Sequence, residues 1–392
     1  MNNRIEIFKQ YERLPFYGGV RQTPYRGGDI PDFLPFAMGL RRDIGLVVQK
    51  PESVVQRALA LSYEHEDLYL TVPMDESELT RWRGEEFLAV LAGEARIDPA
   101  GCDLLEIGCQ TGFILSQMRD RGARVRGCEP GPSAEVARER YGLEVDRCFF
   151  EPGRYRGRAD IVTHLAVLEH VDDPVAFLAE TAAALRPGGV TLIGVPDCEG
   201  QLRLGDPGML LHEHCSYFTP TSLERTLVAA GFSDVGSYSS GVVVYGWGRW
   251  TGRAGPSEGG EGDGAGDGVR AYIEKLDGAV SGVGEWLQAA RGDGERAGFY
   301  GASVGAANLL ALLYHNDVDL KLYDGDPAKQ GAYLSGCPIQ IRNPEELLND
   351  APDRLLILPV NYTDPIERFL REDLKLPISV HVDALSRMLG TG

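Results

Sequence analysis

The segment LHEHCSYFTP at residues 211–220 gathers side chains that can bind metals or transfer protons. His212 and His214 flank Glu213, and Tyr217 follows. Two histidines at this spacing on an extended segment point the same way, as two metal ligands would. A histidine also titrates near neutral pH, so either one could be a general acid or base, with Glu213 orienting it or Tyr217 stabilising charge. A structural role in the core is the third interpretation.

The surroundings of this segment favour acid–base chemistry. It does not match the helical HExxH pattern of zinc proteases, and no dedicated ligand cluster accompanies it, so we expect no metal here. Strands are expected at ADIVTHLAVLEH and VTLIGVPD. Open α/β sheets bind ligands beyond the carboxyl ends of their strands, so His170, His212 and His214 should face a bound ligand. His164 lies within a strand, where a structural role is expected.

A second candidate site is the loop in LLEIGCQTG, residues 104–112. A strand ends at Glu106, and a loop with Gly108 and Gly112 leads into a helix. Such a loop lets a ligand lie against the backbone and the helix N-terminus. The next strand ends in Glu129, about 20 residues further on, where an acid can accept both hydroxyl groups of a ribose. The pattern predicts a nucleoside-containing cofactor.

Regular alternation of strand and helix patterns from 103 to 197 predicts a doubly wound parallel sheet that would position both sites. The tail repeats this alternation on a smaller scale. We therefore expect an α/β protein. Its predicted parts are an irregular N-terminal region at 1–80, a central Rossmann-like domain at 81–250, a glycine-rich linker at 251–268 and a second, smaller Rossmann-like domain at 269–392.

Composition limits the partners. The chain has 392 residues, 43% of them hydrophobic, which indicates a folded protein. Its net charge of -19 argues against nucleic acid or an anionic membrane as partner and leaves a small molecule. The polar N-terminus does not look like a signal peptide. The seven cysteines contain no CxxC pair, so we expect reduced thiols in a cytoplasmic protein, monomeric or homodimeric.

Glu106, Gly108, Gly112 and Glu129 resemble the first two motifs of class I methyltransferases, which use S-adenosylmethionine. LRPGG at 185–189 is also typical of them. A generic dinucleotide-binding fold is the alternative, but the glycines of this loop are wrongly placed for a pyrophosphate. The resemblance implies S-adenosylmethionine or S-adenosylhomocysteine bound by Glu106, Gly108, Cys109, Gln110, Gly112, Glu129, Pro130, Phe149, Phe150 and Leu165. Either phenylalanine could cover the adenine or pack in the core.

The whole chain resembles the sugar C-methyltransferases, which methylate C3 of nucleotide-linked 4-keto-6-deoxy sugars. The resemblance rests on HEHxSYF, His170 in LEHVDD, YGAS at 300–303, DGDPAKQG at 324–331 and DIGLVVQ at 43–49. The family has an N-terminal zinc-binding domain, a central methyltransferase domain and a C-terminal Rossmann-like domain. For this chain we expect His214 to generate an enolate, with Glu213 orienting it, and His170 or Tyr217 to bind the enolate oxygen. His212 is a further catalytic candidate.

The chain departs from that family at three places. Ile44 stands where the family has a zinc cysteine, so we expect apolar packing and no zinc there. Leu211 replaces the tyrosine that precedes HEH, and the family's AKGN reads GAAN at 305–308. The last two changes favour O- or N-methylation of another small metabolite as the alternative function. A protein that binds the cofactor without transferring methyl is the second alternative.

The tail contains one more candidate site. GASVG at 301–305, followed by Asp324 on the next expected strand, is a weak signal for a second dinucleotide site, and a structural or substrate-cleft role is favoured. From their position near a helix N-terminus, Tyr300, Ser303 and Asn308 are candidates for contacting a substrate phosphate.

Overall fold

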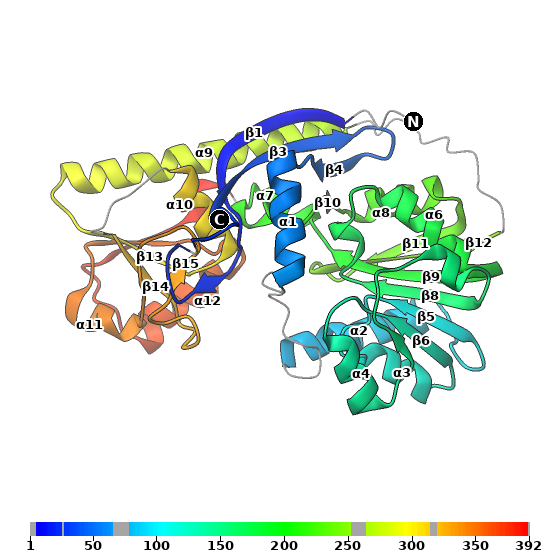
Figure 1. The fold of residues 1–392 in the computed structure, drawn as a ribbon. Coiled ribbons are helices and arrows are strands. Elements are labelled where there is room, and N and C mark those ends of the chain that lie inside the picture. Colours follow the sequence, from blue (N-terminus) through cyan, green and yellow to red (C-terminus); the bar gives the residue numbers. More distant parts are fainter. Residues whose placement is uncertain (1–4, 26, 66–77, 252–263, 314–319, 391–392) are drawn as a thin grey trace.

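The computed structural model describes residues 5–25, 27–65, 78–251, 264–313 and 320–390 (Figure 1). The N-terminal region forms an antiparallel sheet in the order β1-β3-β4-β10. Its strands are β1 (Ile5–Pro15), β3 (Phe33–Arg41), β4 (Leu46–Gln49) and β10 (Ser216–Tyr217). Because β10 belongs to the histidine segment, the N-terminal sheet pairs directly with the segment that contains the candidate catalytic residues.

Only β4 was expected from the sequence of this region. Pro35 lies inside β3, the strand between β1 and β4, where a proline argues against a strand. The pairing of β1 and β3 shifts register between Tyr11 and Leu14, opposite this proline, so Pro35 sits at a bulge. The helix α1 (Ser53–His65) follows β4.

The N-terminal sheet is fixed to the central domain by charge and by apolar packing. The buried guanidinium of Arg41 bridges Asp43 (2.8 Å) and Asp173 (2.9 Å), the residue that caps α6 (Pro174–Ala184). Ile44 is 1% exposed and packs in the same apolar cluster as Leu105 of the central sheet. The position of the family's zinc cysteine is therefore part of the apolar core.

The central sheet has the order β11-β12-β9-β8-β5-β6-β7. Its strands are β5 (Asp103–Ile107), β6 (Arg124–Cys128), β7 (Val145–Asp146), β8 (Ala159–Leu165), β9 (Leu185–Pro196), β11 (Phe232–Ser239) and β12 (Val243–Trp250). Strands β5 to β9 are parallel, and β12 runs antiparallel to β9, which confirms the predicted doubly wound sheet. The strand order reverses between β5 and β8, so a ligand site is expected at their carboxyl ends.

Helices cover both faces of this sheet (Figure 1). Leu104 packs with α2 (Glu78–Gly93), α3 (Phe113–Asp120) and α4 (Ser133–Tyr141). Its neighbour Leu105 packs with α5 (Pro152–Tyr155), α6 and α8 (Pro220–Ala229) on the opposite face. This alternation follows from the two-residue period of a strand, and it explains why β5 is buried from Leu104 to Ile107.

The C-terminal domain confirms the second Rossmann-like unit, with a parallel sheet in the order β16-β14-β13-β17-β18. Its elements are β13 (Ala297–Tyr300), α10 (Val304–Leu312), β14 (Lys321–Tyr323), β16 (Ile341–Arg342), α11 (Leu347–Asp350), β17 (Arg354–Ile357), α12 (Thr363–Arg368), β18 (His381–Ala384) and α13 (Leu385–Met388). The long helix α9 (Ala265–Gly292) precedes it and begins inside the predicted linker. Residues 252–263 of that linker lie outside the described residues.

The helix α9 joins two parts of the molecule (Figure 1). Val269, Tyr272 and Leu276 in its first half pack in one apolar cluster with the N-terminal sheet. Val283 and Leu287 in its second half pack in the core of the C-terminal domain. A short pairing of β2 (Val20–Arg21) with β15 (Tyr333–Leu334) adds a second connection. No helix within the described residues is long and apolar enough to cross a membrane.

Candidate active site

The glycine loop after β5 takes a conformation that its two glycines require. Gly108 and Gly112 have φ angles of +70° and +81°. A Cβ on Gly108 would lie 2.6 Å from Val167, and one on Gly112 would lie 2.5 Å from Leu143. Since backbone strain and contact both exclude a side chain, these positions admit only glycine. Gly112 also caps α3, so the loop delivers the helix N-terminus to the ligand site.

Two buried carboxyl groups border this loop. Burial, together with the charge of Glu129, raises the pKa of Glu106 to about 8. Within the described residues, Oε2 of Glu106 has no hydrogen-bond partner. Burial also raises the pKa of Glu129, although its carboxylate accepts the N–H groups of Gly131 (2.8 Å) and Gln110 (3.0 Å). Buried acceptors with spare capacity fit a cofactor that brings amino and ribose hydroxyl donors.

Two residues with side chains also adopt left-handed backbone angles here. Gln110 has φ +46° in the glycine loop, and Ala166 has φ +57° directly after β8. Such strain costs about 1 to 3 kcal/mol and gathers at functional sites. Gln110 lines a hollow, and Ala166 follows another residue that lines it. The lining residues are Glu106, Gly108, Cys109, Gln110, Thr111, Phe113, Ile114 and Leu165. The hollow contains five of the predicted cofactor-binding residues and adds Thr111, Phe113 and Ile114, for which no motif gave a signal.

Three further predicted cofactor residues, Phe149, Phe150 and Pro130, do not line this hollow. Phe150 stacks on Tyr155 with ring centroids 5.7 Å apart and packs edge-on against Phe177, so its ring belongs to the core. This packing gives Phe150 a structural role, and its contact with the adenine stays a prediction. Phe149 is 69% exposed and leaves its ring free for that contact. Pro130 follows Glu129 in the turn before α4 and lies outside the residues that line the hollow.

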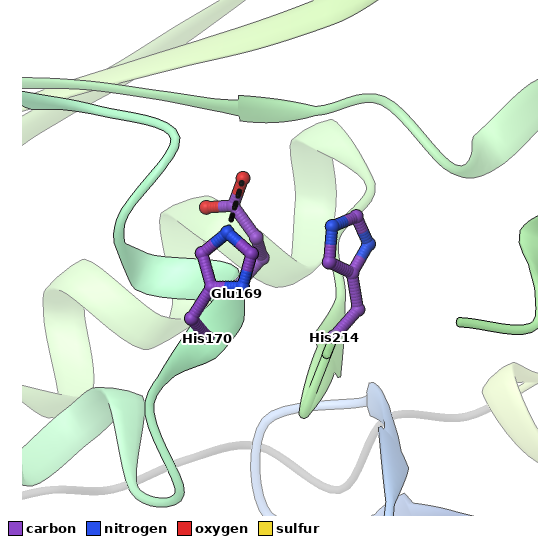
Figure 2. Close-up of side chains that lie close together, drawn as sticks. All are labelled: Glu169, His170 and His214. Atoms are coloured by element: carbon purple, nitrogen blue, oxygen red, sulfur yellow. Dashed lines mark ion pairs between the residues drawn. The ribbon is translucent and has the colours of Figure 1, made fainter. Parts of the chain in front are cut away.

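A cluster of Glu169, His170 and His214 lies past the end of β8 (Figure 2). One ligand-type atom from each side chain lies within 4.8 Å of the others. Glu169 and His170 belong to the 3-10 helix η1 (Leu168–His170), three residues beyond Leu165. The histidine segment joins this turn through the N–H of Cys215, which donates to the carbonyl of Glu169 at 2.7 Å. Val167, which contacts Gly108, places the cluster next to the glycine loop.

Hydrogen bonding fixes the ring of His170. Its Nδ1 lies 2.9 Å from the main-chain oxygen of Glu213, which can only accept, so Nδ1 carries a proton. Nε2 then faces Oε1 of Glu169 at 3.8 Å. Burial raises the pKa of Glu169, and the charge of His170 opposes this shift. Glu169 was not among the predicted residues, although it stands beside His170 in the motif LEHVDD.

His214 meets His170 edge to face, with ring centroids 5.0 Å apart. Burial, reinforced by the charge of His170, lowers the pKa of His214 to about 3. Its ring is therefore neutral at neutral pH. The expected orienting contact is absent, because the described residues contain no hydrogen bond between the carboxyl group of Glu213 and His214. Glu213 acts instead through its main-chain oxygen on His170.

Two other predicted catalytic residues hydrogen-bond to the main chain, although the ring of Tyr217 lies only 6.3 Å from that of His214 between centroids. His212 packs between the rings of Phe16 and Phe36, and its Nδ1 hydrogen-bonds to the main-chain oxygen of Pro15 at 3.1 Å. Burial lowers the pKa of His212 to about 4. The hydroxyl of Tyr217 donates to the carbonyl of Leu211 (3.0 Å) and accepts its N–H (3.3 Å). These contacts contradict a catalytic role for His212, because residues 211–214 form a turn closed by the N–H of His214 on the oxygen of Leu211 and not an extended segment. The hydroxyl of Tyr217 is bonded to the main chain and is not free to hold an enolate oxygen.

The amide of Gln49 explains why the N-terminal sheet borders the site. With its nitrogen turned toward the acceptors around it, this side chain donates to the main-chain oxygens of His212 and His214, both at 3.0 Å. The N–H of Gln49 also donates to the oxygen of Cys215 at 3.0 Å. Gln49 lies in the DIGLVVQ segment, so that motif supports the histidine segment directly.

The tail residues do not form a free phosphate site. The hydroxyl of Ser303 caps α10 by accepting the N–H of Ala306. The carboxylate of Asp324 accepts the N–H of Ala302 at 2.7 Å and pairs with Lys329 at 3.2 Å. Tyr300 is buried, and burial raises its pKa to about 12. Asn308 is 2% exposed and donates to main-chain oxygens of the central domain, which contradicts a phosphate contact.

Comparison with known proteins agrees with this arrangement. A family model described as a methyltransferase domain matches residues 78–236, and one described as a C-methyltransferase C-terminal domain matches residues 265–375. The chain belongs to the S-adenosylmethionine-dependent methyltransferases. The first match contains the glycine loop, both acids and the histidine cluster of this methyltransferase. The second contains α9 and the C-terminal sheet.

Two curated relatives differ in how much of the methyltransferase they cover. C-methyltransferase NovU of Streptomyces niveus is 27% identical over 293 residues, 67% of each chain. A ubiquinone biosynthesis O-methyltransferase of Psychrobacter arcticus is 30% identical over 162 residues, 36% of this chain and 62% of its own. A crystal structure of a 1,6-didemethyltoxoflavin-N1-methyltransferase from Burkholderia thailandensis covers 55% of this chain and 96% of its own at 19% identity. Its TM-score is 0.38, too low to bear on the substrate.

Proposed function

We propose that this methyltransferase methylates a carbon next to a ketone of a nucleotide-linked deoxysugar, a reaction of natural-product biosynthesis. The observation that carries the proposal is the cluster of His214, His170 and Glu169 beside the glycine loop in a chain with a C-methyltransferase C-terminal domain. The similarity to the sugar C-methyltransferases supports the substrate class. Seven free cysteines fit a reducing compartment, and we place the enzyme in the cytoplasm.

The reaction needs a carbanion, and His214 is the proposed base. A ketone acidifies the adjacent C–H bond, and the neutral imidazole of His214 can take that proton. The imidazolium that results would be costly in a buried place. A carboxylate oxygen of Glu169 within 4.8 Å offsets part of that cost.

His170 is the proposed donor to the enolate oxygen. Its Nδ1 proton is committed to the oxygen of Glu213, so Nε2 can donate only when the ring is doubly protonated. Burial raises the pKa of Glu169 and Glu213, and a charge on His170 opposes both shifts. A positioned cationic donor at a developing enolate is among the strongest contributions to catalysis.

S-adenosylmethionine supplies the electrophilic methyl group. Glu129 would hold its ribose hydroxyls, Glu106 would accept a hydrogen bond from its amino group, and Gly108 lets it lie against the loop. The remaining contribution of the chain is geometric, because base, carbon and methyl must be in line.

Methylation of oxygen or nitrogen is the second candidate function. The central domain is similar to O-methyltransferases, and Leu211 stands where the sugar enzymes have a tyrosine. In that case a hydroxyl or amine is the nucleophile, and His214 assists by removing its proton.

Proton exchange in D2O tests the proposal. The purified protein with S-adenosylhomocysteine is incubated with a nucleotide-linked 4-keto-6-deoxy sugar, and deuterium at C3 is followed by mass spectrometry. We expect exchange that depends on the protein and is lost in His214→Ala. Exchange equal to the uncatalysed rate would exclude enolate formation on this substrate and favour the second candidate.

A further inference from the structure

The C-terminal domain packs directly on the segment that leads to His214. The 3-10 helix η2 (Pro207–Met209) immediately precedes the histidine segment. Its Gly208 meets Gly305 of α10 so closely that a Cβ on Gly305 would lie 3.1 Å from the main-chain nitrogen of Gly208. Two glycines face to face allow this approach of backbones, which larger residues would prevent.

One buried amide holds the carbonyl groups at this contact. Nδ2 of Asn308 donates to the oxygens of Pro207 and Leu210, both at 2.8 Å. Asn308 is 2% exposed, so both bonds lie in a dry environment. Losing them would leave the carbonyl of Pro207 with the longer bond from the N–H of Leu210, at 3.4 Å, and remove the side-chain donor from the carbonyl of Leu210. Leu210 comes four residues before His214 in the chain.

A second amide holds the other end of the same segment from the opposite domain. The side chain of Gln49 donates to the oxygens of His212 and His214 at 3.0 Å each. Between them, the N–H of His214 donates to the oxygen of Leu211 at 3.1 Å and closes a turn. The histidine segment is therefore clamped between the N-terminal sheet and the C-terminal domain.

We propose that Asn308 is a positioning residue that sets the location of His214 through this clamp. This inference rests on the proposed role of His214 as base. It gives the C-terminal domain a part in catalysis without contact to the substrate. Because proton removal depends strongly on the distance between base and carbon, a shift of about 1 Å in the segment can lower the rate about 100-fold.

Two variants disturb the clamp in different ways. Asn308→Ala removes both hydrogen bonds. Gly305→Ala retains the amide of Asn308 and adds a methyl group 3.1 Å from the main-chain nitrogen of Gly208, so η2 must shift by a few tenths of an ångström. Thr363→Val is the matched control, since it removes a buried hydrogen bond to Ser386 (2.8 Å) elsewhere in the C-terminal domain.

Hydrogen exchange of the unliganded proteins, read by mass spectrometry on the peptide that contains 207–216, tests the clamp independently of the reaction. We expect exchange about tenfold faster in Asn308→Ala, faster also in Gly305→Ala, and unchanged in Thr363→Val. The kcat for deuteration at C3 should be about 100-fold lower in Asn308→Ala and less reduced in Gly305→Ala. The affinity for the cofactor should not change in either variant.

The two readouts separate the possible failures. Unchanged exchange of the peptide in both variants would overturn the clamp. Faster exchange with full kcat, in a protein that His214→Ala inactivates, would overturn the positioning role of Asn308. Faster exchange in a protein whose His214→Ala form stays active would overturn the proposed base itself.

Discussion

The rings of His170 and His214 meet edge to face, 5.0 Å apart between centroids, although they come from separate segments of the chain. Of the two, only the ring of His170 is tied by a hydrogen bond to a residue that the structure describes, from its Nδ1 to the oxygen of Glu213. The tied ring is suited to hold an oxygen and the untied ring to accept a proton. This division of roles leads to the first three predictions.

Replacing His214 should stop the reaction and leave cofactor binding intact. We expect His214→Ala to lower C3 deuteration and methyl transfer at least about 100-fold, because the variant lacks the proposed base. Calorimetric binding of S-adenosylhomocysteine should match the wild type. His381→Ala, a change at an exposed histidine of the C-terminal domain, is the control. Equal activity of the two variants would refute the assignment.

Glu169→Gln should test whether the reaction depends on the carboxyl group of this side chain or only on its size. The change keeps the size of the buried side chain and removes the carboxyl group that lies beside both imidazoles of the cluster. We expect kcat to fall about 10- to 100-fold. The exposed Glu180→Gln on α6 should have no effect. A wild-type rate in Glu169→Gln would mean that the carboxylate is only a structural part of η1.

Removing metals should leave the enzyme active. Glu169, His170 and His214 could also hold a divalent ion, and metal-bound histidines often donate their other N–H to a carbonyl, as His170 does here. Acid–base chemistry needs no such ion, so dialysis against a chelator should not change the rate. Loss of activity that Zn²⁺ restores, with about one ion bound per chain, would identify the cluster as a metal centre instead.

Gln110→Gly should stabilise the protein. At φ +46° a glutamine carries a strain that glycine avoids, so we expect a gain of about 1 kcal/mol in the free energy of unfolding. The N–H that binds Glu129 is retained, and cofactor affinity should not change. Gln117→Gly within α3 is the matched control and should lose about 1 kcal/mol. Urea denaturation of both variants measures the difference, and losses of equal size would refute the strain.

His164 should make the fold sensitive to acid. Its ring is fully buried in β8, and burial lowers its pKa from 6.5 to about 3. The unfolded chain therefore binds a proton near pH 6.5 that the folded chain does not bind. The free energy of unfolding falls as pH drops below that value. One such histidine should cost about 2 kcal/mol between pH 7.5 and pH 5.

The change His164→Leu isolates this effect. His212 and His214, also lowered in pKa, act in the same direction and remain in the variant. The stability of His164→Leu, measured by urea denaturation across this pH range, should therefore decline less steeply than that of the wild type. Parallel pH curves would contradict the prediction.

Sequence patterns identified the glycine loop because its chemistry is local, with Glu106, Gly108 and Gly112 joined by one turn. They did not identify β3, since the bulge that accommodates Pro35 depends on a partner strand. They also assigned His212 to catalysis, because the spacing predicts an extended segment, whereas residues 211–214 form a turn that separates the directions of His212 and His214. Glu169 was overlooked for a related reason. A glutamate is normally exposed, and only the fold shows that this one is buried.

The helix α9 has a consequence for exchanging parts between related enzymes. At about 1.5 Å per residue it is a single rod of about 42 Å, whose two halves are built into different cores. A chimera that takes α9 and the C-terminal domain from a relative would lose Val269, Tyr272 and Leu276. The relative's residues at these positions would then pack against the N-terminal sheet of this chain. Substrate range should therefore transfer only when both ends of the chain are exchanged together around the retained central domain.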